Sequence, residues 1–265
     1  MNSIKDVETF LLDMDGTVYL GNELIDGAKD FIELMKQQNK KCIFLTNNSS
    51  KSKSIYVEKL NKLNIEACED DVFTSGEATT IYVNSLKPNA KIFLLGTKAL
   101  EDEFISSGFE LVKERNQEVD YVVLGFDTTL TYEKLWIACD YLRDGVGYIA
   151  THPDFNCPLA EGKFMPDAGA IIEFIYASTN RRPYVVGKPN SFIIDSICSK
   201  YKLTKESLAM VGDRLYTDIK TGVNAGISSI LVYSGETTEQ DYAESDVKAT
   251  FTYPSLKEMK EELEI

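Results

Sequence analysis

Short apolar runs alternate with stretches of helical spacing along the whole chain. The apolar runs predict strands at 10–13, 42–46, 92–95, 121–125, 148–151, 208–212 and 229–232. Between several of them, apolar residues recur with a period near 3.6, which predicts helices at 28–39, 51–63, 132–143 and 190–201. Strands that alternate with helices are typical of an α/β protein with a mostly parallel sheet.

The number of strand–helix units exceeds what one sheet of ordinary size would use, yet no Pro-, Gly- or Ser-rich linker divides the chain. A domain inserted into a loop of another domain accommodates both observations. We expect the chain to cross between the two domains near 75–78 and near 183–187.

Composition places the chain in the folded globular class. Of its 265 residues, 43% are hydrophobic and 26% are charged, which excludes disordered and collagen-like proteins. The net charge of −14 makes nucleic acids and anionic membranes poor partners. An anionic ligand would have to be attracted by a few placed cations, helix N-termini or a bound metal ion.

Cellular location is predicted from two features. The five cysteines are widely spaced and form no Cys-x-x-Cys pair, which favours reduced thiols. No signal peptide is evident, and no run approaches the roughly 18 apolar residues of a membrane-spanning helix. We therefore expect a cytoplasmic protein.

Two acids end the first predicted strand, in the sequence Asp13-Met14-Asp15-Gly16. Residues two apart on a strand point to the same side, and the carboxyl edge of a parallel sheet is where open α/β folds bind ligands. A divalent cation or a proton would reconcile the two carboxylates. Two solvated acids followed by a glycine turn account for this motif equally well.

Polar residues also end two other apolar runs. Thr46 and Asn47 follow the second strand and suit phosphate oxygens, whereas the serines after them are more simply helix caps. Lys188 precedes Pro189, which we expect in the first turn of a helix, so an anion should face this lysine. The alternative is an exposed surface lysine.

Asp213 and Asp218 bracket a turn after the strand at 208–212. Together with Asp13 and Asp15 they would form an oxygen-rich site that suits Mg²⁺. Taken alone, the two could be N-terminal helix caps.

The ordered set of these motifs resembles the haloacid dehalogenase (HAD) superfamily of phosphatases, whose fold is a Rossmann-like α/β core with an inserted α/β cap domain. The tracts at 123–127, 151–154 and 166–169 are similar to its NagD-like, para-nitrophenylphosphatase-like branch. His152 departs from the Asn expected in many relatives. The resemblance implies a discontinuous core, residues 1–76 and 186–265, and a cap at 77–185 that closes over the site and selects the leaving group.

The resemblance also implies an Mg²⁺-dependent phosphatase that hydrolyses small phosphate monoesters. Asp13 would be the nucleophile that forms an aspartyl-phosphate, and Asp15 the general acid and base. Asp13, the Asp15 carbonyl and Asp213 would hold Mg²⁺, with Asp218 supporting them. The remaining implied positions are phosphate binding by Thr46, Asn47 and Lys188, and cap selectivity by His152, Asp154, Asn156 and Asp167.

For His152, a packed structural ring bonded to a backbone group is favoured over a catalytic role. For the aromatic residues Trp136, Phe155 and Phe164, packing is favoured over a substrate platform. A phosphotransferase with the same aspartyl-phosphate and a noncatalytic phosphate-binding module stay open as alternatives. The expected partner is a small phosphorylated metabolite, and the cap could supply a homodimer surface, although no pattern specifies one.

Overall fold

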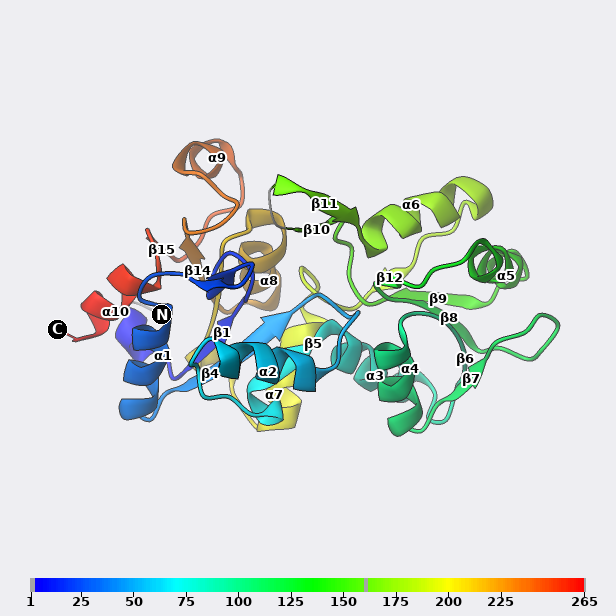
Figure 1. Cartoon of the computed structure of the whole chain (residues 1–265), viewed down its shortest axis with the longest axis horizontal. Coiled ribbons are helices and arrows are strands. Elements are labelled where there is room, and N and C mark those ends of the chain that lie inside the picture. The colour runs from blue at the N-terminus through cyan, green and yellow to red at the C-terminus, as the bar shows by residue number, and fades with distance from the viewer. Residues whose placement is uncertain (1–2, 160–161, 265) are drawn as a thin grey trace. The chain divides into compact units, whose positions relative to one another are not determined.

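The structure, a computed structural model, describes residues 3–159 and 162–264. The chain divides into two compact units (Figure 1). The first contains the residues up to Thr46, Lys53–Phe73 and the chain from Lys188 onward; the second contains Asn47–Ser52 and Thr74–Gly187. No sequence pattern predicted that the short segment Asn47–Ser52 belongs to the second unit. The role of the inserted segment as a cap stays a prediction.

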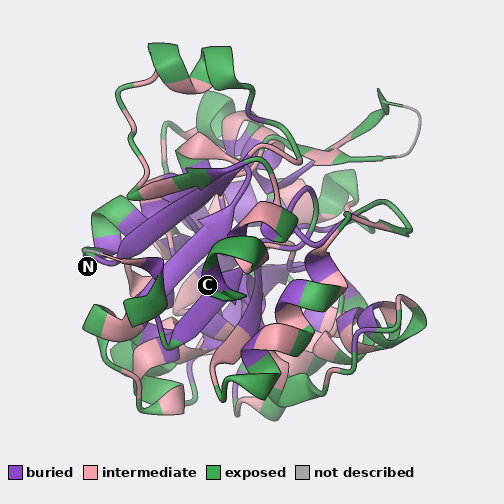
Figure 2. Ribbon diagram, turned by 90° about the vertical axis from the view of Figure 1, so that its left-hand side faces the viewer, coloured by how far each residue is buried: buried purple, intermediate pink, exposed green. Residues whose placement is uncertain are grey.

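The first unit is built on a twisted sheet. Its strands lie in the order β15 (Phe251–Tyr253), β14 (Ser228–Val232), β13 (Leu208–Gly212), β1 (Thr9–Leu12), β4 (Lys41–Thr46) and β5 (Val72–Thr74). The strand β1 pairs in parallel with β13 and with β4. All residues of β1 are buried, as expected for a parallel strand covered on both faces. Figure 2 shows several strands that are buried in this way.

Helices and short elements complete the first unit. They are α1 (Ala28–Gln37), α2 (Lys53–Lys62), α7 (Phe192–Tyr201), α8 (Lys220–Ala225), α9 (Glu239–Glu244), α10 (Leu256–Glu264), the hairpin β2 (Tyr19–Leu20) and β3 (Glu23–Leu24), the 3₁₀ turns Ile4–Asp6, Glu69–Asp71 and Lys205–Ser207, and the π-helical turn η5 (Leu215–Ile219). In α1, Ala28, Phe31 and Met35 are buried along one face, so the helix packs by its apolar stripe. Phe31 meets Phe10 of β1 edge-on, with ring centroids 5.4 Å apart.

The second unit has its own parallel sheet. The strands lie in the order β12 (Tyr184–Val185), β9 (Gly147–Ala150), β8 (Tyr121–Leu124), β6 (Lys91–Leu95) and β7 (Glu110–Val112). Its other elements are α3 (Ser75–Leu86), α4 (Lys98–Ser106), α5 (Tyr132–Arg143), α6 (Ala168–Thr179) and the antiparallel hairpin β10 (Asn156–Pro158) and β11 (Phe164–Pro166). A core that includes Leu95, Leu124 and Ala150 underlies α5 and α6.

Both sheets pair in parallel across their central strands, which confirms the predicted α/β fold. Each predicted strand and helix is present, with bounds shifted by a few residues at most. All five cysteines are free thiols. Among the described residues, no helix has the length and apolar character needed to cross a membrane.

Candidate active site

Three carboxylates gather at the carboxyl edge of the first sheet. Asp13 follows β1 and Asp213 follows the neighbouring strand β13; the Asp13 N–H continues the ladder by donating to Val211 O at 2.9 Å. Asp218 lies in the π-helical turn η5, directly after β13. One carboxylate oxygen of each aspartate lies within 4.8 Å of the others. Parallel neighbours end at the same edge, so the fold forces these acids together.

Lys188 lies between two of these carboxylates. Its Nζ donates to Asp13 Oδ1 at 2.5 Å and to Asp218 Oδ1 at 2.7 Å, and its side chain is only 3% exposed. Burial alone would lower the pKa of the ammonium, but the two carboxylates outweigh it and raise that pKa above its ordinary value. The expected anion opposite Lys188 is therefore confirmed.

The local structure around Lys188 differs from the prediction. Pro189 does not begin a helix, because α7 starts at Phe192 and the two preceding residues lie in a turn. The Asn190 side chain accepts the Phe192 N–H at 2.9 Å in this turn, and the Lys188–Pro189 peptide bond is cis. Lys188 is held by its carboxylate partners rather than by a helix start.

The surroundings of Asp213 disfavour its ionised form. Burial, followed by the negative charges of Asp13 and Asp218, raises its pKa to about 8. Its Oδ2 accepts the Glu236 N–H at 2.6 Å, but its Oδ1 is buried with no hydrogen-bond partner within the described part of the chain. Burial raises the pKa of Asp218 to about 6, although Lys188 opposes the shift.

Two glycines make room for Asp213. A Cβ on Gly16 would lie 2.4 Å from Asp213 Oδ2, and one on Gly235 would lie 2.0 Å from the same oxygen. Gly16 also has φ +93°, a conformation that favours glycine and supplies the sharp turn predicted after Asp15.

The loop 233–237 is part of the site, and sequence reasoning missed it. The Ser234 hydroxyl donates to Gly16 O at 2.8 Å, and Glu236 forms an ion pair with Arg214 at 2.9 Å in addition to its backbone bond to Asp213. A signal existed, because this loop follows β14, whose carboxyl end lies at the same sheet edge as those of β1 and β13.

The Asp15 side chain lies apart from the buried carboxylates. It is 52% exposed, and its Oδ1 lies 3.9 Å from Lys59 Nζ. Lys59 in turn lies over the ring of Tyr19, 3.5 Å from its centroid. The Gly16 N–H donates to Tyr19 O at 2.8 Å and closes the turn that carries Asp15. An exposed carboxylate beside a lysine is available to a molecule in solution.

Thr46 and Asn47 belong to different units. Thr46 ends β4 and is buried, whereas Asn47 is in the second unit, where its amide donates to Asp154 Oδ1 at 3.1 Å. The chain therefore leaves the first sheet between the two residues predicted to bind phosphate.

The candidate selectivity residues all lie in the second unit. His152 is fully buried; its Nε2 bonds to Asp167 Oδ1 and its Nδ1 to Thr151 Oγ1, both at 2.8 Å. These two partners are side chains, and the burial of the ring agrees with the expected packed, structural position. Asp167 also caps α6, and Asn156 is exposed in β10.

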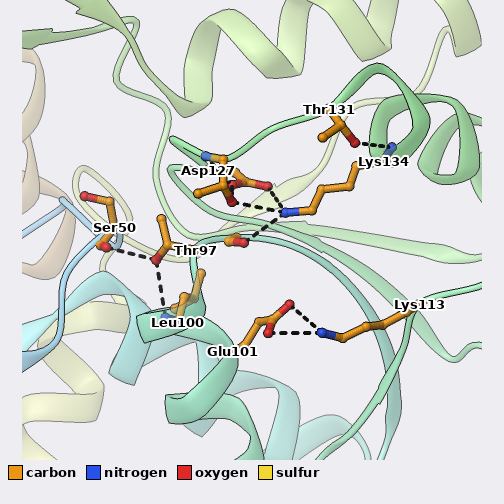
Figure 3. Close-up of polar contacts among 10 residues, drawn as sticks. Ser50, Thr97, Leu100, Glu101, Lys113, Asp127, Thr131 and Lys134 are labelled. Carbon is orange, nitrogen blue, oxygen red and sulfur yellow. Dashed lines mark hydrogen bonds and ion pairs between the residues drawn. The ribbon is translucent and has the colours of Figure 1, made fainter.

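Asp127, for which the sequence indicates no role, is buried and forms an ion pair with Lys134, whose side chain is 28% exposed. Its Oδ2 accepts from Lys134 Nζ at 2.7 Å, and that ammonium also donates to Gly96 O at 3.3 Å (Figure 3). Three aromatic residues expected to be packed are not in the core, because they are more than half exposed: Trp136 53%, Phe155 57% and Phe164 64%. Trp136 packs against Arg115, whose guanidinium lies 3.7 Å from the ring centroid.

The buried carboxylates fit a hard divalent cation. All three contribute oxygen donors, the kind of ligand that Mg²⁺ and Ca²⁺ prefer. The unpartnered Oδ1 of Asp213 and the raised pKa of its carboxyl both show that the protein itself stabilises the ionised form of this group poorly. A cation at this point would satisfy both.

Comparison with known proteins relates this chain to hydrolases. Residues 10–110 match the family described as haloacid dehalogenase-like hydrolase, and residues 185–259 match a HAD-hydrolase-like family. An acid sugar phosphatase from Staphylococcus aureus is 38% identical over 98% of this chain and 100% of its own length.

Solved structures extend the likeness to the whole fold. A 4-nitrophenylphosphatase from Thermotoga maritima superposes with a TM-score of 0.92 at 47% identity, covering 98% of each chain. A putative NagD protein gives 0.91 at 47% identity over 97% of this chain and 99% of the other. A glycerol phosphate phosphatase from Mycobacterium tuberculosis, solved with magnesium, gives 0.89 at 28% identity over 97% and 77%. The chain therefore belongs to the haloacid dehalogenase-like hydrolases, in their NagD-like branch of phosphatases.

Proposed function

We propose that this chain is a metal-dependent phosphatase that hydrolyses small phosphate monoesters, sugar phosphates among them, through an aspartyl-phosphate on Asp13. The observation that carries the proposal is the contact of Asp13 Oδ1 with Lys188 Nζ, beside the buried carboxylates of Asp213 and Asp218. A carboxylate nucleophile needs its negative charge balanced before it can approach a phosphate dianion, and this site concentrates such balancing groups.

Asp13 is the nucleophile of the proposed reaction. One of its oxygens attacks phosphorus, the bond from phosphorus to the leaving-group oxygen breaks, and the phosphoryl group is transferred to the carboxylate. Lys188 keeps its proton throughout, because its pKa is raised, and it offsets charge on both Asp13 and the transferred group. Water then attacks phosphorus, which releases inorganic phosphate and restores Asp13.

Asp15 is the proposed general acid and base. It donates a proton to the departing alkoxide and then accepts one from the attacking water. Its exposure suits this exchange, because the carboxyl group can meet both a leaving group and solvent. Thr46 and Asn47 are assigned to the phosphoryl oxygens.

A divalent cation, which we take to be Mg²⁺, would be held by the Asp13 and Asp213 carboxylates and the Asp15 carbonyl, with Asp218 in support. When bound, it would supply positive charge that lets an anionic nucleophile and an anionic substrate meet. The chain has a net charge of −14, so Lys188 and this cation account for the attraction of an anionic ligand.

The names of the relatives support the substrate class. An acid sugar phosphatase and two phosphatases named for nitrophenyl phosphate and glycerol phosphate share nearly the whole length of this chain. We assign the choice among leaving groups to the second unit, in particular to Asp154 and Asn156, and residues 77–185 to the role of a cap. His152 and Asp167 belong to the same unit but are buried, and no contact with the leaving group is assigned to them.

The first test is hydrolysis of para-nitrophenyl phosphate with Mg²⁺ and with EDTA, by the wild type and by Asp13→Asn. We expect activity that needs the metal and is lost in the variant. The matched control is Asp102→Asn, which removes an exposed aspartate on α4. Acid-quenched protein should carry phosphate on the Asp13 peptide. A metal-independent wild type, or full activity of Asp13→Asn, would exclude this mechanism.

A further inference from the structure

A continuous chain of buried side chains runs through the second unit. Ser49 Oγ lies 3.0 Å from Thr151 Oγ1, which lies 2.8 Å from His152 Nδ1; the opposite ring nitrogen, Nε2, lies 2.8 Å from Asp167 Oδ1. None of the four residues is more than 3% exposed. We call Ser49, Thr151, His152 and Asp167 the relay. It joins three segments that are far apart in the sequence.

Backbone groups fix both ends of the relay. The Phe126 N–H donates to Ser49 Oγ at 2.9 Å, and the Ala168 N–H donates to Asp167 Oδ1 at 2.5 Å. A backbone N–H only donates and an ionised carboxylate only accepts. The direction of the hydrogen bonds is therefore set from outside the relay.

For a neutral imidazole, this direction selects one tautomer of the histidine. Asp167 accepts, so Nε2 of His152 carries the ring proton and Nδ1 of the neutral ring is an acceptor. Thr151 then donates to Nδ1 and accepts the hydroxyl hydrogen of Ser49. Every hydroxyl in the relay thus uses its single hydrogen within the relay.

Thr151 holds both chain segments that connect the second unit to proposed phosphate-binding residues. Its hydroxyl meets Ser49, in the segment Asn47–Ser52, while its carbonyl accepts the Gly187 N–H at 2.8 Å. The packing is tight, because a Cβ on Gly187 would lie 2.4 Å from Thr151 O and 2.7 Å from Asn47 Oδ1.

These two segments lead directly to the chemistry. Asn47 follows Thr46 in sequence, and Lys188 follows Gly187. A shift of Ser49 or Gly187 passes along one to three peptide units to groups that the proposed function assigns to phosphate. Positions of reacting groups matter at this scale, because a displacement near 1 Å can cost about 100-fold in rate.

We propose that His152 is a positioning residue for phosphate transfer: through Thr151 it sets the two segments that carry Asn47 and Lys188, and it does not touch the substrate. This inference rests on the proposed phosphatase function. It differs from a selectivity role, because a positioning residue affects every substrate alike, whereas a residue in contact with the leaving group changes the ranking of substrates.

Two substitutions each keep one of the two hydrogen bonds of the His152 ring. In His152→Asn the side-chain oxygen can take the place of Nδ1 and accept from Thr151, whereas in His152→Gln the amide nitrogen can take the place of Nε2 and donate to Asp167. We expect His152→Gln to lower kcat/KM about 10- to 100-fold, by the same factor for para-nitrophenyl phosphate and for a sugar phosphate that the wild type hydrolyses. His152→Asn should recover most of this loss.

Thr151→Val is the second activity test, because it removes the hydroxyl and keeps the shape. It should lower kcat/KM as His152→Gln does. Thr131→Val is the matched control, since Thr131 caps α5 in the same unit and lies outside the relay. Wild-type kcat/KM in Thr151→Val, equal activity of the Asn and Gln variants, or a changed ranking of substrates would overturn the proposal.

A measurement independent of activity is available because His152 is the only histidine in the chain. The ¹⁵N NMR signals of its ring should show the neutral form with the proton on Nε2, and Thr151→Val should shift the Nδ1 signal. A proton on Nδ1 would reverse the relay and refute it. An inactive wild type with the expected ring signals would instead reject the phosphatase function and leave the relay intact.

Discussion

Each of the two sheets has a lysine whose ammonium contacts aspartate side chains at the carboxyl edge. The two sites differ in the number of carboxylates that surround the lysine. Lys134 pairs with one buried aspartate, Asp127, whose other oxygen accepts from Thr129 (Figure 3). Lys188 is shared by Asp13 and Asp218, with Asp213 beside them. One lysine completes a neutral pair, and the other leaves negative charge in excess.

The difference separates structure from chemistry. A buried charge with a partner of opposite sign stabilises the arrangement of its neighbours. At Asp213, burial and then the charges of Asp13 and Asp218 raise the pKa against the opposing charge of Arg214, and a bound cation would stabilise the ionised carboxylate. Both regions follow strand ends and both use Asp and Lys. The count of charges, rather than the residue types, distinguishes the candidate active site.

The largest effect is expected from the same substitution at the two lysines. Lys188→Met should lower kcat/KM for para-nitrophenyl phosphate about 100- to 1,000-fold, because it removes the cation that contacts Asp13, the proposed nucleophile. Lys134→Met should leave kcat/KM unchanged and lower only the free energy of unfolding. Steady-state kinetics on both variants check this. Comparable losses of activity would show that the two lysines do not differ in their role.

The charge excess also predicts how stability depends on pH in the absence of metal. The pKa of Asp213 is raised from 3.8 to about 8, so between these values the folded protein binds more protons than the unfolded chain. Its contribution is present at low pH and is lost as pH rises through about 8. In EDTA, as pH rises from 3.8 to about 8, the free energy of unfolding should fall by a few kcal/mol more in the wild type than in Asp213→Asn.

Urea unfolding at several pH values measures this difference, and added Mg²⁺ should reduce it by binding the ionised carboxylates. Parallel pH profiles of the wild type and Asp213→Asn would show that the carboxylate is not under electrostatic strain.

Asp127→Asn is the corresponding substitution at the Lys134 pair. At alkaline pH, Asp213→Asn should raise the free energy of unfolding, whereas Asp127→Asn should lower it. The Asp127 substitution breaks a satisfied ion pair, so we expect the free energy of unfolding to fall by about 1–3 kcal/mol with no change in kcat/KM. Thermal or urea unfolding measures the loss. A stabilised Asp127→Asn would place this pair in the same strained class as the candidate active site.

The smallest effect is expected at a helix end that takes no part in either charge cluster. Thr131 accepts the Lys134 N–H at 3.2 Å as the cap of α5, and Thr131→Val should cost about 1 kcal/mol of unfolding free energy. Activity should not change. A loss of activity here would mean that the stability of the second unit, rather than its charge balance, limits catalysis.

Much of the candidate site was predictable because it depends on strand ends. Asp13 and Asp213 were found since an apolar run fixes a buried strand, and a parallel sheet brings the ends of neighbouring strands to one edge. The pairing of Lys188 with an anion was also predictable, although its reason was not, because the expected helix at Pro189 begins only at Phe192.

Other features depend on contacts between distant segments, which leave no local pattern. The membership of Asn47–Ser52 in the second unit rests on bonds such as Ser49 to Thr151 and Asn47 to Asp154. The loop 233–237 contributes backbone groups, whose positions do not depend on side-chain type. Exposure of Trp136 follows from which helix face the sheet leaves uncovered, and apolar character alone does not specify it.

The position of β1 has a consequence for how the protein is made. Thr9 pairs with Lys41 on one side but with Leu208 on the other, so the strand that precedes Asp13 leaves the ribosome well before the strand that completes its ladder. By then the whole of residues 74–187 has been synthesised. Asp13, the proposed nucleophile, is therefore synthesised before residues 74–187, but the strand that places Asp213 beside it is synthesised after them.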